Sequence, residues 1–387
     1  MRKICFITGT RADFGIMSPI MRLVAESKDA ELQIIATNMH LSDKFGKTVQ
    51  EIEKDGFQVN FCINCLEDED SAAETVRSMS RLLAGLSETL PILKPDLTVI
   101  LGDRYEALAS SLASVTLGIP VAHLHGGETT EGAMDDMFRH AITKLSTLHF
   151  AATPLYASRI IRMGEDPSRV FHSGAPGAEI ANESSPDLYE KLLSIAGLSP
   201  QDKFILMAMH PVTMLPDRGL GEVNSVITAL NGEIEAGYKI LVTMPNSDPG
   251  NEGIINLLEI WERKNERKVK LVKSLGSSLF HEAMRHASAI VGNSSAALIE
   301  APSLALPAVN IGFRQKGRAN GATVVNVKAE IPEIKKALRN ILSPEFHEFM
   351  IKLSLEERNP YYRKDAVKFI ADKLINSYLP SSKPFVD

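Results

Sequence analysis

Short runs of β-branched and aliphatic residues alternate with amphipathic stretches from the first residues of the chain to about residue 330. This alternation is typical of βαβ units, in which each strand is followed by a helix and the strands form a parallel sheet. Continuous apolar runs predict strands that are buried on both faces. In the first half we expect them at 3–8, 32–37, 58–62, 97–101, 121–124, 148–151 and 170–172. The pattern therefore predicts an α/β fold.

The alternation is interrupted around 173–200, where small residues, Pro and Ser precede a new series of strands. A chain of 387 residues also exceeds the size that one hydrophobic core usually supports. We therefore predict two Rossmann-like, doubly wound domains, at 1–176 and 177–364, that face each other across a cleft. In the second domain we expect strands at 204–209, 239–244, 269–272, 289–292 and 308–311.

The last part of the chain, 365–387, contains a helical pattern with Val367, Ile370 and Leu374 on one apolar face. A helix of this kind is expected to pack back on a domain. The sequence leaves open which domain it covers, and the N-terminal domain is one of the two candidates.

The charge balance argues against nucleic acid as a partner, because the formal net charge is −6 and no stripe of Lys and Arg is present. An anionic small molecule remains a suitable ligand, since a few arginines and helix N-termini can bind phosphate on an acidic protein. The first apolar run ends at Gly9 without a cleavage site, and no run is long enough to span a bilayer. We therefore expect a cytoplasmic protein with no membrane partner.

Three cysteines are too few for a disulfide framework. Cys62 and Cys65 form a C-x-x-C, but no second pair or histidine follows at the spacing of a zinc site. We interpret them as inert structural residues and expect no metal centre.

Polar residues follow several predicted strands of the first domain, and ligands of open α/β sheets bind at the carboxyl ends of strands. Arg11 lies in GTRADFG after the first strand, where a guanidinium can bind phosphate, and the absence of a G-x-G-x-x-G fingerprint argues against NAD. Asp103 and Arg104 follow a later strand in LGDRYE. Each of these residues could equally be a helix cap or a solvated surface residue.

The next strand ends in HLHGGE, which contains His123, His125 and Glu128. The following helix begins with Asp135 and carries Arg139 one turn later. Acids at a helix start are also explained by the helix dipole. Because Asp103, Glu128 and Asp135 are expected near one sheet edge, however, they form a candidate set for general acid–base catalysis.

The second domain offers polar groups at its own strand ends. His210 lies in MHPVT and Asn246 in PNSD, although a lone histidine is more often structural. The segment GNSSAALIEAPS predicts a strand followed by a helix whose N-terminus could bind a diphosphate, with simple N-capping as the alternative. It supplies Asn293, Ser294, Ser295 and, one to two turns into the helix, Glu300 as a candidate ribose ligand; Arg314 follows the next strand.

In order along the chain, the blocks GTRADFG, MHLS, LGDRYE, HLHGGE, DDMFRHAITKLS, MHPVT, PNSD, GNSSAALIEAPS and GFRQKGR resemble the hydrolysing UDP-N-acetylglucosamine 2-epimerases. The likeness is greatest to the bacterial branch that feeds sialic acid and related nonulosonic acid synthesis. It implies a glycosyltransferase-B-like fold, a homodimer or homotetramer, and a reaction that needs neither a cofactor nor a metal. In that reaction, elimination of UDP from UDP-N-acetylglucosamine gives a 2-acetamidoglucal, and water addition then yields N-acetylmannosamine.

The resemblance also implies roles for individual residues. The nucleoside diphosphate would be held by Arg11, Ser294, Ser295, Glu300 and Arg314, while Asn246 and Asn293 are candidate binding residues from their positions after predicted strands. The sugar would be surrounded by Asp103, Arg104, Asp135, Arg139 and His210, with His125 or Glu128 as the base. The choice of base is open because some relatives carry a catalytic Glu at the position of His125.

Ala296, Ala297 and Phe313 also depart from the pattern of many relatives, which leaves UDP- or GDP-N,N'-diacetylbacillosamine as an alternative substrate. Three other classes remain open. They are a glycosyltransferase, a non-catalytic sensor of sugar nucleotides, and a metal-dependent hydrolase that would use His123, His125, Asp135, Asp136 and His140.

Overall fold

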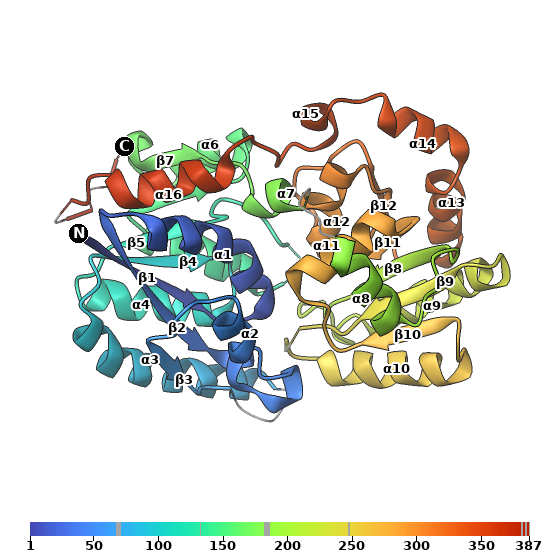
Figure 1. Cartoon of the computed structure of the whole chain (residues 1–387), viewed down its shortest axis with the longest axis horizontal. Coiled ribbons are helices and arrows are strands. Elements are labelled where there is room, and N and C mark those ends of the chain that lie inside the picture. The colour runs from blue at the N-terminus through green and yellow to red at the C-terminus, as the bar shows by residue number, and fades with distance from the viewer. Residues whose placement is uncertain are drawn as a thin grey trace. The chain divides into compact units, whose positions relative to one another are not determined.

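The computed structural model describes residues 1–66, 71–131, 133–181, 186–246, 248–380, 382, 383, 385 and 386. The chain forms two compact units, each built on its own parallel sheet (Figure 1). The first unit comprises Met1–Glu128, Asp135–Pro176 and Arg363–Asp387, and the second comprises Thr129–Met134 and Gly177–Tyr362. Within the described residues, no helix is long and apolar enough to cross a membrane.

The sheet of the first unit has the strand order β3-β2-β1-β4-β5-β6-β7, and every neighbouring pair is parallel. The order reverses between β1 and β4, which makes the carboxyl ends of these strands the switch point where ligands of such sheets bind. The strands are β1 (Arg2–Thr8), β2 (Ala30–Thr37), β3 (Phe61–Ile63), β4 (Leu97–Leu101), β5 (Val121–Leu124), β6 (Leu148–Ala151) and β7 (Val170–His172).

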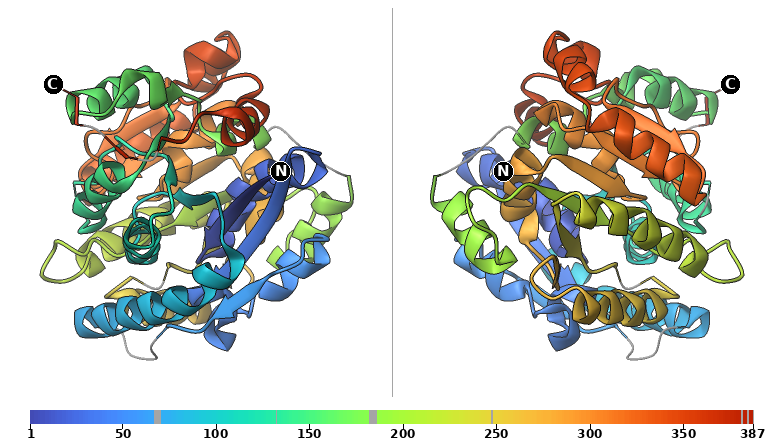
Figure 2. Two further views of the ribbon diagram at one scale, coloured as in Figure 1. Left: turned by 90° about the vertical axis from the view of Figure 1, so that its left-hand side faces the viewer. Right: turned by 90° about the vertical axis from the view of Figure 1, so that its right-hand side faces the viewer.

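Helices cover both faces of this sheet (Figures 1 and 2). Along β1, Ile4 and Phe6 belong to one buried cluster, whereas Cys5 and Ile7 belong to another. This alternation shows why the strand reads as a continuous apolar run. The helices of this unit are α1 (Arg11–Glu26), α2 (Val49–Lys54), α3 (Ala72–Leu93), α4 (Tyr105–Thr116), α5 (Asp135–Leu145), α6 (Pro154–Arg162) and α16 (Ala366–Asn376), with 3₁₀ turns at Asn38–Leu41, Asp43–Phe45 and Pro167–Arg169. The short helix α7 (Pro176–Ile180) begins at the last residue of this unit and continues into the second.

The C-terminal helix α16 packs on the first unit. Ile370 and Leu374 lie in the same buried cluster as Ile4 and Phe6. The Arg2 guanidinium donates hydrogen bonds of 2.7 Å to the carbonyls of Leu374 and Ser377. Beyond the helix, Lys383 Nζ lies 2.7 Å from a carboxylate oxygen of the buried Glu165. Helix α16 and Lys383 are therefore held to this unit by apolar and charged contacts, respectively.

The second unit has the strand order β10-β9-β8-β11-β12-β13, again with all pairs parallel and with the reversal between β8 and β11. Its strands are β8 (Phe204–Ala208), β9 (Lys239–Thr243), β10 (Val269–Val272), β11 (Ala289–Gly292), β12 (Ala308–Ile311) and β13 (Val324–Val327). Its helices are α8 (Pro186–Ala196), α9 (Leu220–Glu235), α10 (Asn251–Lys264), α11 (Gly276–His286), α12 (Ala296–Ile299), α13 (Ile331–Ile341), α14 (Pro344–Ile351) and α15 (Leu355–Arg358), with a 3₁₀ turn at Ala301–Leu304.

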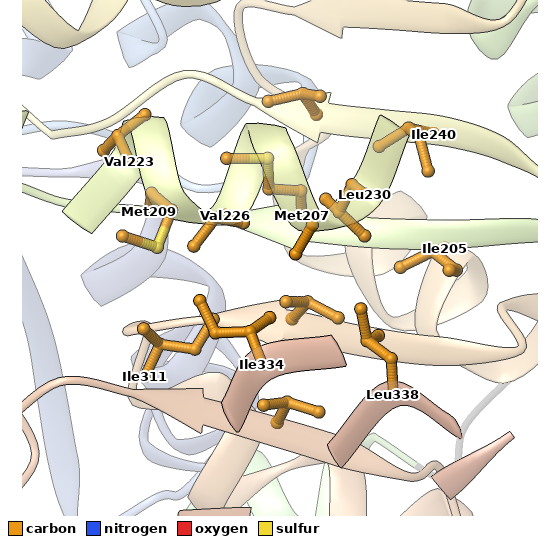
Figure 3. Packing of buried hydrophobic residues seen from close by; sticks show 14 of the residues in the cluster. Ile205, Met207, Met209, Val223, Val226, Leu230, Ile240, Ile311, Ile334 and Leu338 are labelled. Atoms are coloured by element: carbon orange, nitrogen blue, oxygen red, sulfur yellow. The ribbon is translucent and has the colours of Figure 1, made fainter. Parts of the chain in front are cut away.

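An apolar cluster joins the sheet of this unit to helices α9, α10 and α13, and Figure 3 shows part of it. Val226 and Leu230 of α9 and Ile334 and Leu338 of α13 pack against side chains from β8 and β12. The predicted α/β class with two doubly wound parallel sheets is confirmed. The sequence pattern missed β13, an edge strand whose side chains are partly exposed and which contains Asn326.

Candidate functional site

Arg139 joins three of the predicted catalytic residues in the first unit. Its guanidinium, only 2% exposed, projects from α5. Nη1 donates a 2.7 Å hydrogen bond to the carbonyl of His125 and lies 3.9 Å from Glu128 Oε2, while Nη2 is ion-paired with Asp103. Asp103 follows β4, and His125 and Glu128 follow β5. The structure therefore brings these four residues together at the carboxyl edge of the sheet.

The turn after β5 holds His125 in an unusual conformation. His125 has φ +64°, a left-handed conformation that is uncommon for a residue with a side chain, and Gly127 follows with φ +75°. His125 Nδ1 lies 2.6 Å from Glu128 Oε1. Within the described part of the chain, the buried Nε2 has no hydrogen-bond partner. A histidine oriented by a carboxylate through one nitrogen can accept a proton at the other.

His123, two residues earlier, is engaged through both ring nitrogens. Nε2 lies 2.7 Å from the carbonyl of Gly102, and Nδ1 lies 3.3 Å from Thr143 Oγ1. Burial lowers the pKa of His123 to about 3, so that the ring is neutral. His123 therefore supports the turn after β4.

Two predicted arginines form separate ion pairs. Arg11 pairs with Glu51 of α2, and burial lowers its pKa from the ordinary value. Arg104 Nε lies 2.6 Å from Glu106 Oε1. Both of these ion pairs are formed with acids that do not belong to the array around Arg139.

A small pocket lies at the switch point between β1 and β4. Its cavity volume is about 10 Å³, roughly the space of one water molecule, and its polar lining consists of Asp13, Thr37, Arg104, Glu106 and Ser110. Burial, reinforced by the charge of Glu106, raises the pKa of Asp13 to about 7. Sequence reasoning missed Asp13 and Glu106, although both lie inside the motifs that supplied Arg11 and Asp103.

Asp135 opens α5 one turn before Arg139, where predicted, and is partly buried. Its neighbour Asp136 has a carboxylate oxygen 3.6 Å from His140 Nε2. No group of three or more His, Cys, Asp or Glu side chains in the described ranges is arranged to hold a metal ion.

In the second unit, Asn293 connects the loops that follow three strands. It is fully buried after β11, and its side-chain amide exchanges hydrogen bonds of 2.7 and 2.9 Å with the backbone N–H and C=O of His210, after β8. Its own carbonyl accepts from Arg314 Nη1 at 3.2 Å and from Gln315 Nε2 at 2.8 Å, both after β12. Asn293 therefore fixes the polar loops at the switch point of this sheet.

Two further contacts define this region. A Cβ on Gly292, which has φ +148°, would fall 2.0 Å from the carbonyl oxygen of Ala208, so the approach of β11 to β8 requires glycine. The backbone N–H of Asn246 donates to His210 Nδ1 at 3.3 Å. In a neutral ring this hydrogen bond assigns the proton to Nε2, which makes His210 a hydrogen-bond donor at that atom.

The helix predicted to run through Glu300 is shorter than expected. α12 spans only Ala296–Ile299, and Glu300 marks the change to a 3₁₀ turn that contains Pro302. Proline lacks the N–H that would continue the α-helical hydrogen bonds. Because a single turn has little macrodipole, an anion here would depend on side chains and local N–H groups. Ser294, 9% exposed, and Ser295 lie at the start of this turn.

Two further acidic residues of the second unit are Glu300 and Glu222. Glu300 Oε2 lies 3.3 Å from Nε2 of the buried His281, a partner that sequence reasoning missed. Glu222, in the first turn of α9, is buried beside Gly312. Burial, reinforced by Asp217, raises the pKa of Glu222 to about 7.

Comparison with known proteins agrees with the resemblance read from the sequence. Residues 22–375 match the UDP-N-acetylglucosamine 2-epimerase family. The chain is 35% identical to a hydrolysing GDP/UDP-N,N'-diacetylbacillosamine 2-epimerase of Campylobacter jejuni, over 89% of this chain and 88% of the relative. It is 30% identical to a UDP-N-acetylglucosamine 2-epimerase of Neisseria meningitidis, over 89% and 88%.

The fold of the chain is shared with solved structures. Aligned by structure, the Neisseria meningitidis UDP-GlcNAc 2-epimerase bound to UDP-GlcNAc has a TM-score of 0.79 and 20% identity, and the alignment covers 96% of this chain and 99% of that chain. The predicted pair of Rossmann-like domains of a glycosyltransferase-B-like fold is therefore confirmed.

Proposed function

Because the chain belongs to the UDP-N-acetylglucosamine 2-epimerase family, we propose that it is a hydrolysing 2-epimerase acting on a nucleotide-activated 2-acetamido sugar. The observation that carries the proposal is the array in which Arg139 connects Asp103 with the His125–Glu128 pair. The array supplies a candidate base beside further acidic groups, as the chemistry requires.

The reaction has two steps. A base removes the proton from C2 while the C1–O bond to the diphosphate breaks, which gives the 2-acetamidoglucal and the nucleoside diphosphate. Water then adds its oxygen to C1, and a proton returns to C2 on the opposite face. Inversion at C2 therefore calls for two proton-transferring groups, one on each face of the sugar ring.

We assign the first proton transfer to His125 Nε2, with Glu128 holding the ring through Nδ1. The acids Asp103 and Asp135 are assigned to the second step, in which a proton returns to C2 and water attacks C1. Arg139 keeps Asp103 in position by its ion pair. Arg104, which follows Asp103 in the chain, is a candidate contact for the sugar.

The second unit is assigned the leaving group. The hydroxyls of Ser294 and Ser295 and the guanidinium of Arg314 are candidate ligands of the diphosphate, and Glu300 is a candidate ligand of the ribose hydroxyls. His210, held by Asn246 and Asn293, can donate from Nε2 to the departing oxygen. Donors placed where negative charge develops stabilise the transition state of bond cleavage. Arg11 is retained as a candidate phosphate ligand that would have to exchange Glu51 for the substrate.

The names of the relatives indicate two candidate sugar substrates. The 35% identical relative is named for N,N'-diacetylbacillosamine, which makes a UDP- or GDP-linked form of that sugar the first substrate to test. UDP-N-acetylglucosamine, the substrate expected from the sequence blocks, is the second because a 30% identical relative carries its name. Both sugars have the same 2-acetamido group and undergo the same chemistry at C1 and C2.

The decisive experiment is to incubate the purified protein with each sugar nucleotide in D₂O and follow the products by NMR. The proposal expects free nucleoside diphosphate and a 2-epimeric sugar carrying deuterium at C2, formed without NAD and after exhaustive chelation. An Asp103→Asn variant serves as the impaired control. Transfer of the sugar without deuterium at C2 would indicate a glycosyltransferase, loss of activity on chelation a metal-dependent hydrolase, and binding without turnover a sensor.

A further inference from the structure

The segment between two proposed catalytic acids belongs to a different unit from the acids themselves. Glu128 and Asp135 lie in the first unit, whereas Thr129–Met134, here called the bridging segment, belongs to the second. Because the chain is continuous, any displacement of the bridging segment acts directly on the backbone of both acids.

Arg318 makes two hydrogen bonds to the bridging segment. Its Nε donates a 2.8 Å hydrogen bond to the carbonyl of Thr129, and Nη2 donates one of 3.1 Å to Thr130 Oγ1. Thr130 is only 2% exposed. Because a guanidinium is planar and presents its donors in a fixed fork, it fixes direction as well as distance.

Two further hydrogen bonds hold the two ends of the bridging segment, Thr129 and Met134. The N–H of Met134 donates to Thr213 Oγ1 at 3.2 Å, and Thr129 Oγ1 donates to the carbonyl of Lys316 at 3.3 Å. A Cβ on Gly317 would fall 2.6 Å from Thr129 Oγ1, so the loop and the segment are closely packed. The segment is therefore a fitted part of the second unit.

The residues that hold the bridging segment lie in the loops assigned to the nucleotide. Arg318 shares the loop after β12 with Arg314, and Thr213 lies three residues after His210. Both loops are connected by Asn293 through the hydrogen bonds described above. A nucleotide that orders these loops would also order the bridging segment.

We propose that Arg318 is a positioning residue that places Glu128 and Asp135 according to the state of the nucleotide loops. It acts through the bridging segment and makes no contact with the substrate. The inference rests on the proposed function. The inference explains why the stretch of chain between Glu128 and Asp135 belongs to the second unit, which is assigned the nucleotide.

The test compares Arg318→Ala and Arg318→Lys with Arg339→Ala, which removes an exposed arginine of α13 in the same unit. We expect Arg318→Ala to lower kcat about 10- to 100-fold, since small displacements of catalytic groups are costly. The Kd for UDP, measured by calorimetry, should stay within about threefold because binding residues are retained. Arg318→Lys, which keeps the charge without the fork, should fall in between, and Arg339→Ala should match the parent.

Hydrogen exchange gives a readout that needs no substrate. In the ligand-free protein, the amides of Ala133 and Met134, which donate to Thr130 and Thr213, should exchange faster in Arg318→Ala than in the parent. Thr130→Val, which removes the acceptor hydroxyl, should act in the same direction and replaces Arg318→Ala if that variant fails to fold.

An unchanged kcat in Arg318→Ala would overturn the inference. The inference would also be overturned if Arg318→Ala kept its kcat and lost as much affinity for UDP as it lost in kcat/KM. Arg318 would then be a nucleotide ligand. If the parent itself turns over no sugar nucleotide, the proposed function fails. In that case hydrogen exchange still tests the contact of Arg318 with the bridging segment. Unchanged exchange at Ala133 and Met134 in Arg318→Ala would refute that contact.

Discussion

The assignment of His125 as the base can be tested by removing the charge of Glu128. Glutamine in its place can still accept the Nδ1 proton of His125 through its carbonyl oxygen, so the ring keeps its orientation while the carboxylate charge is lost. Both side chains are at least nine-tenths buried and their atoms are 2.6 Å apart, so solvent screens the interaction little.

The expected size of the effect follows from this geometry. A hydrogen bond to a charged group contributes about 1.5–3 kcal/mol, which corresponds to a roughly 10- to 150-fold fall in kcat if the contribution is made in the transition state. Removal of the base itself by His125→Asn should cost more, about 10²- to 10⁴-fold. The order of the two variants, more than either value, separates the roles.

The assay measures release of the nucleoside diphosphate and exchange of the C2 hydrogen at saturating substrate. Glu282→Gln is a matched control for the loss of a carboxylate paired with a histidine, because the buried Glu282 pairs with His286 on α11, whose side chain is 35% exposed, with atoms 2.9 Å apart and outside the proposed site. We expect less than a twofold change there. If Glu128→Gln proved the more damaging variant and His125→Asn retained most of the turnover, Glu128 would be the base and our assignment would be wrong.

Two further predictions concern stability. Gly292→Ala should lower the free energy of unfolding by roughly 3 kcal/mol or more in urea titrations, since the added Cβ meets the Ala208 carbonyl at a left-handed φ. Gly232→Ala, in open space within α9, should instead stabilise by about 0.5–1 kcal/mol, and equal effects of the two would contradict this account. Burial raises the pKa of Glu222 to about 7 in the folded chain, so the folded state binds this proton more tightly than the unfolded chain does. The free energy of unfolding therefore falls by up to about 3 kcal/mol as the pH rises from about 4.5 to about 7. Glu222→Gln should therefore raise Tm at pH 8 and leave it unchanged at pH 4; a Tm difference that is independent of pH would refute the argument.

Much of the fold followed from the sequence because buried parallel strands leave a strong one-dimensional signal. Once the strands are placed, their carboxyl ends must share one edge of the sheet, which is why Asp103, His125 and Glu128 could be expected together. The same argument identified His210 and Asn293 at the ends of β8 and β11. Edge strands such as β13 give a weaker signal, because their side chains are partly exposed.

The contacts of long side chains could not be predicted in the same way. Arg139 reaches from α5 to two loops, and Arg11 turns to Glu51, because ion pairs depend on tertiary distances that spacing does not encode. The length of α12 was misjudged although Pro302 was visible in the sequence, since a proline signals a helix end without fixing its position. The contact of Arg318 with Thr129 spans 189 residues, and local patterns carry no information on pairs that far apart.

The two histidines of HLHGGE show how far residue type alone determines function. They are the same amino acid, two positions apart in the chain, and the sequence made both of them candidates for the same chemistry. In the structure β5 ends at Leu124, so only His123 lies on the strand. In the structure, His123 has both nitrogens engaged and a pKa lowered to about 3, and because the strength of a general base follows its pKa, such a ring is too weak a base for a carbon acid at neutral pH. His125 differs because the backbone turns into a left-handed conformation immediately before two glycines, which brings its Nδ1 to Glu128. The turn and the carboxylate that follow the strand therefore determine which histidine is the catalytic candidate. A substitution at Gly126 or Gly127 should lower kcat as much as a substitution at Glu128.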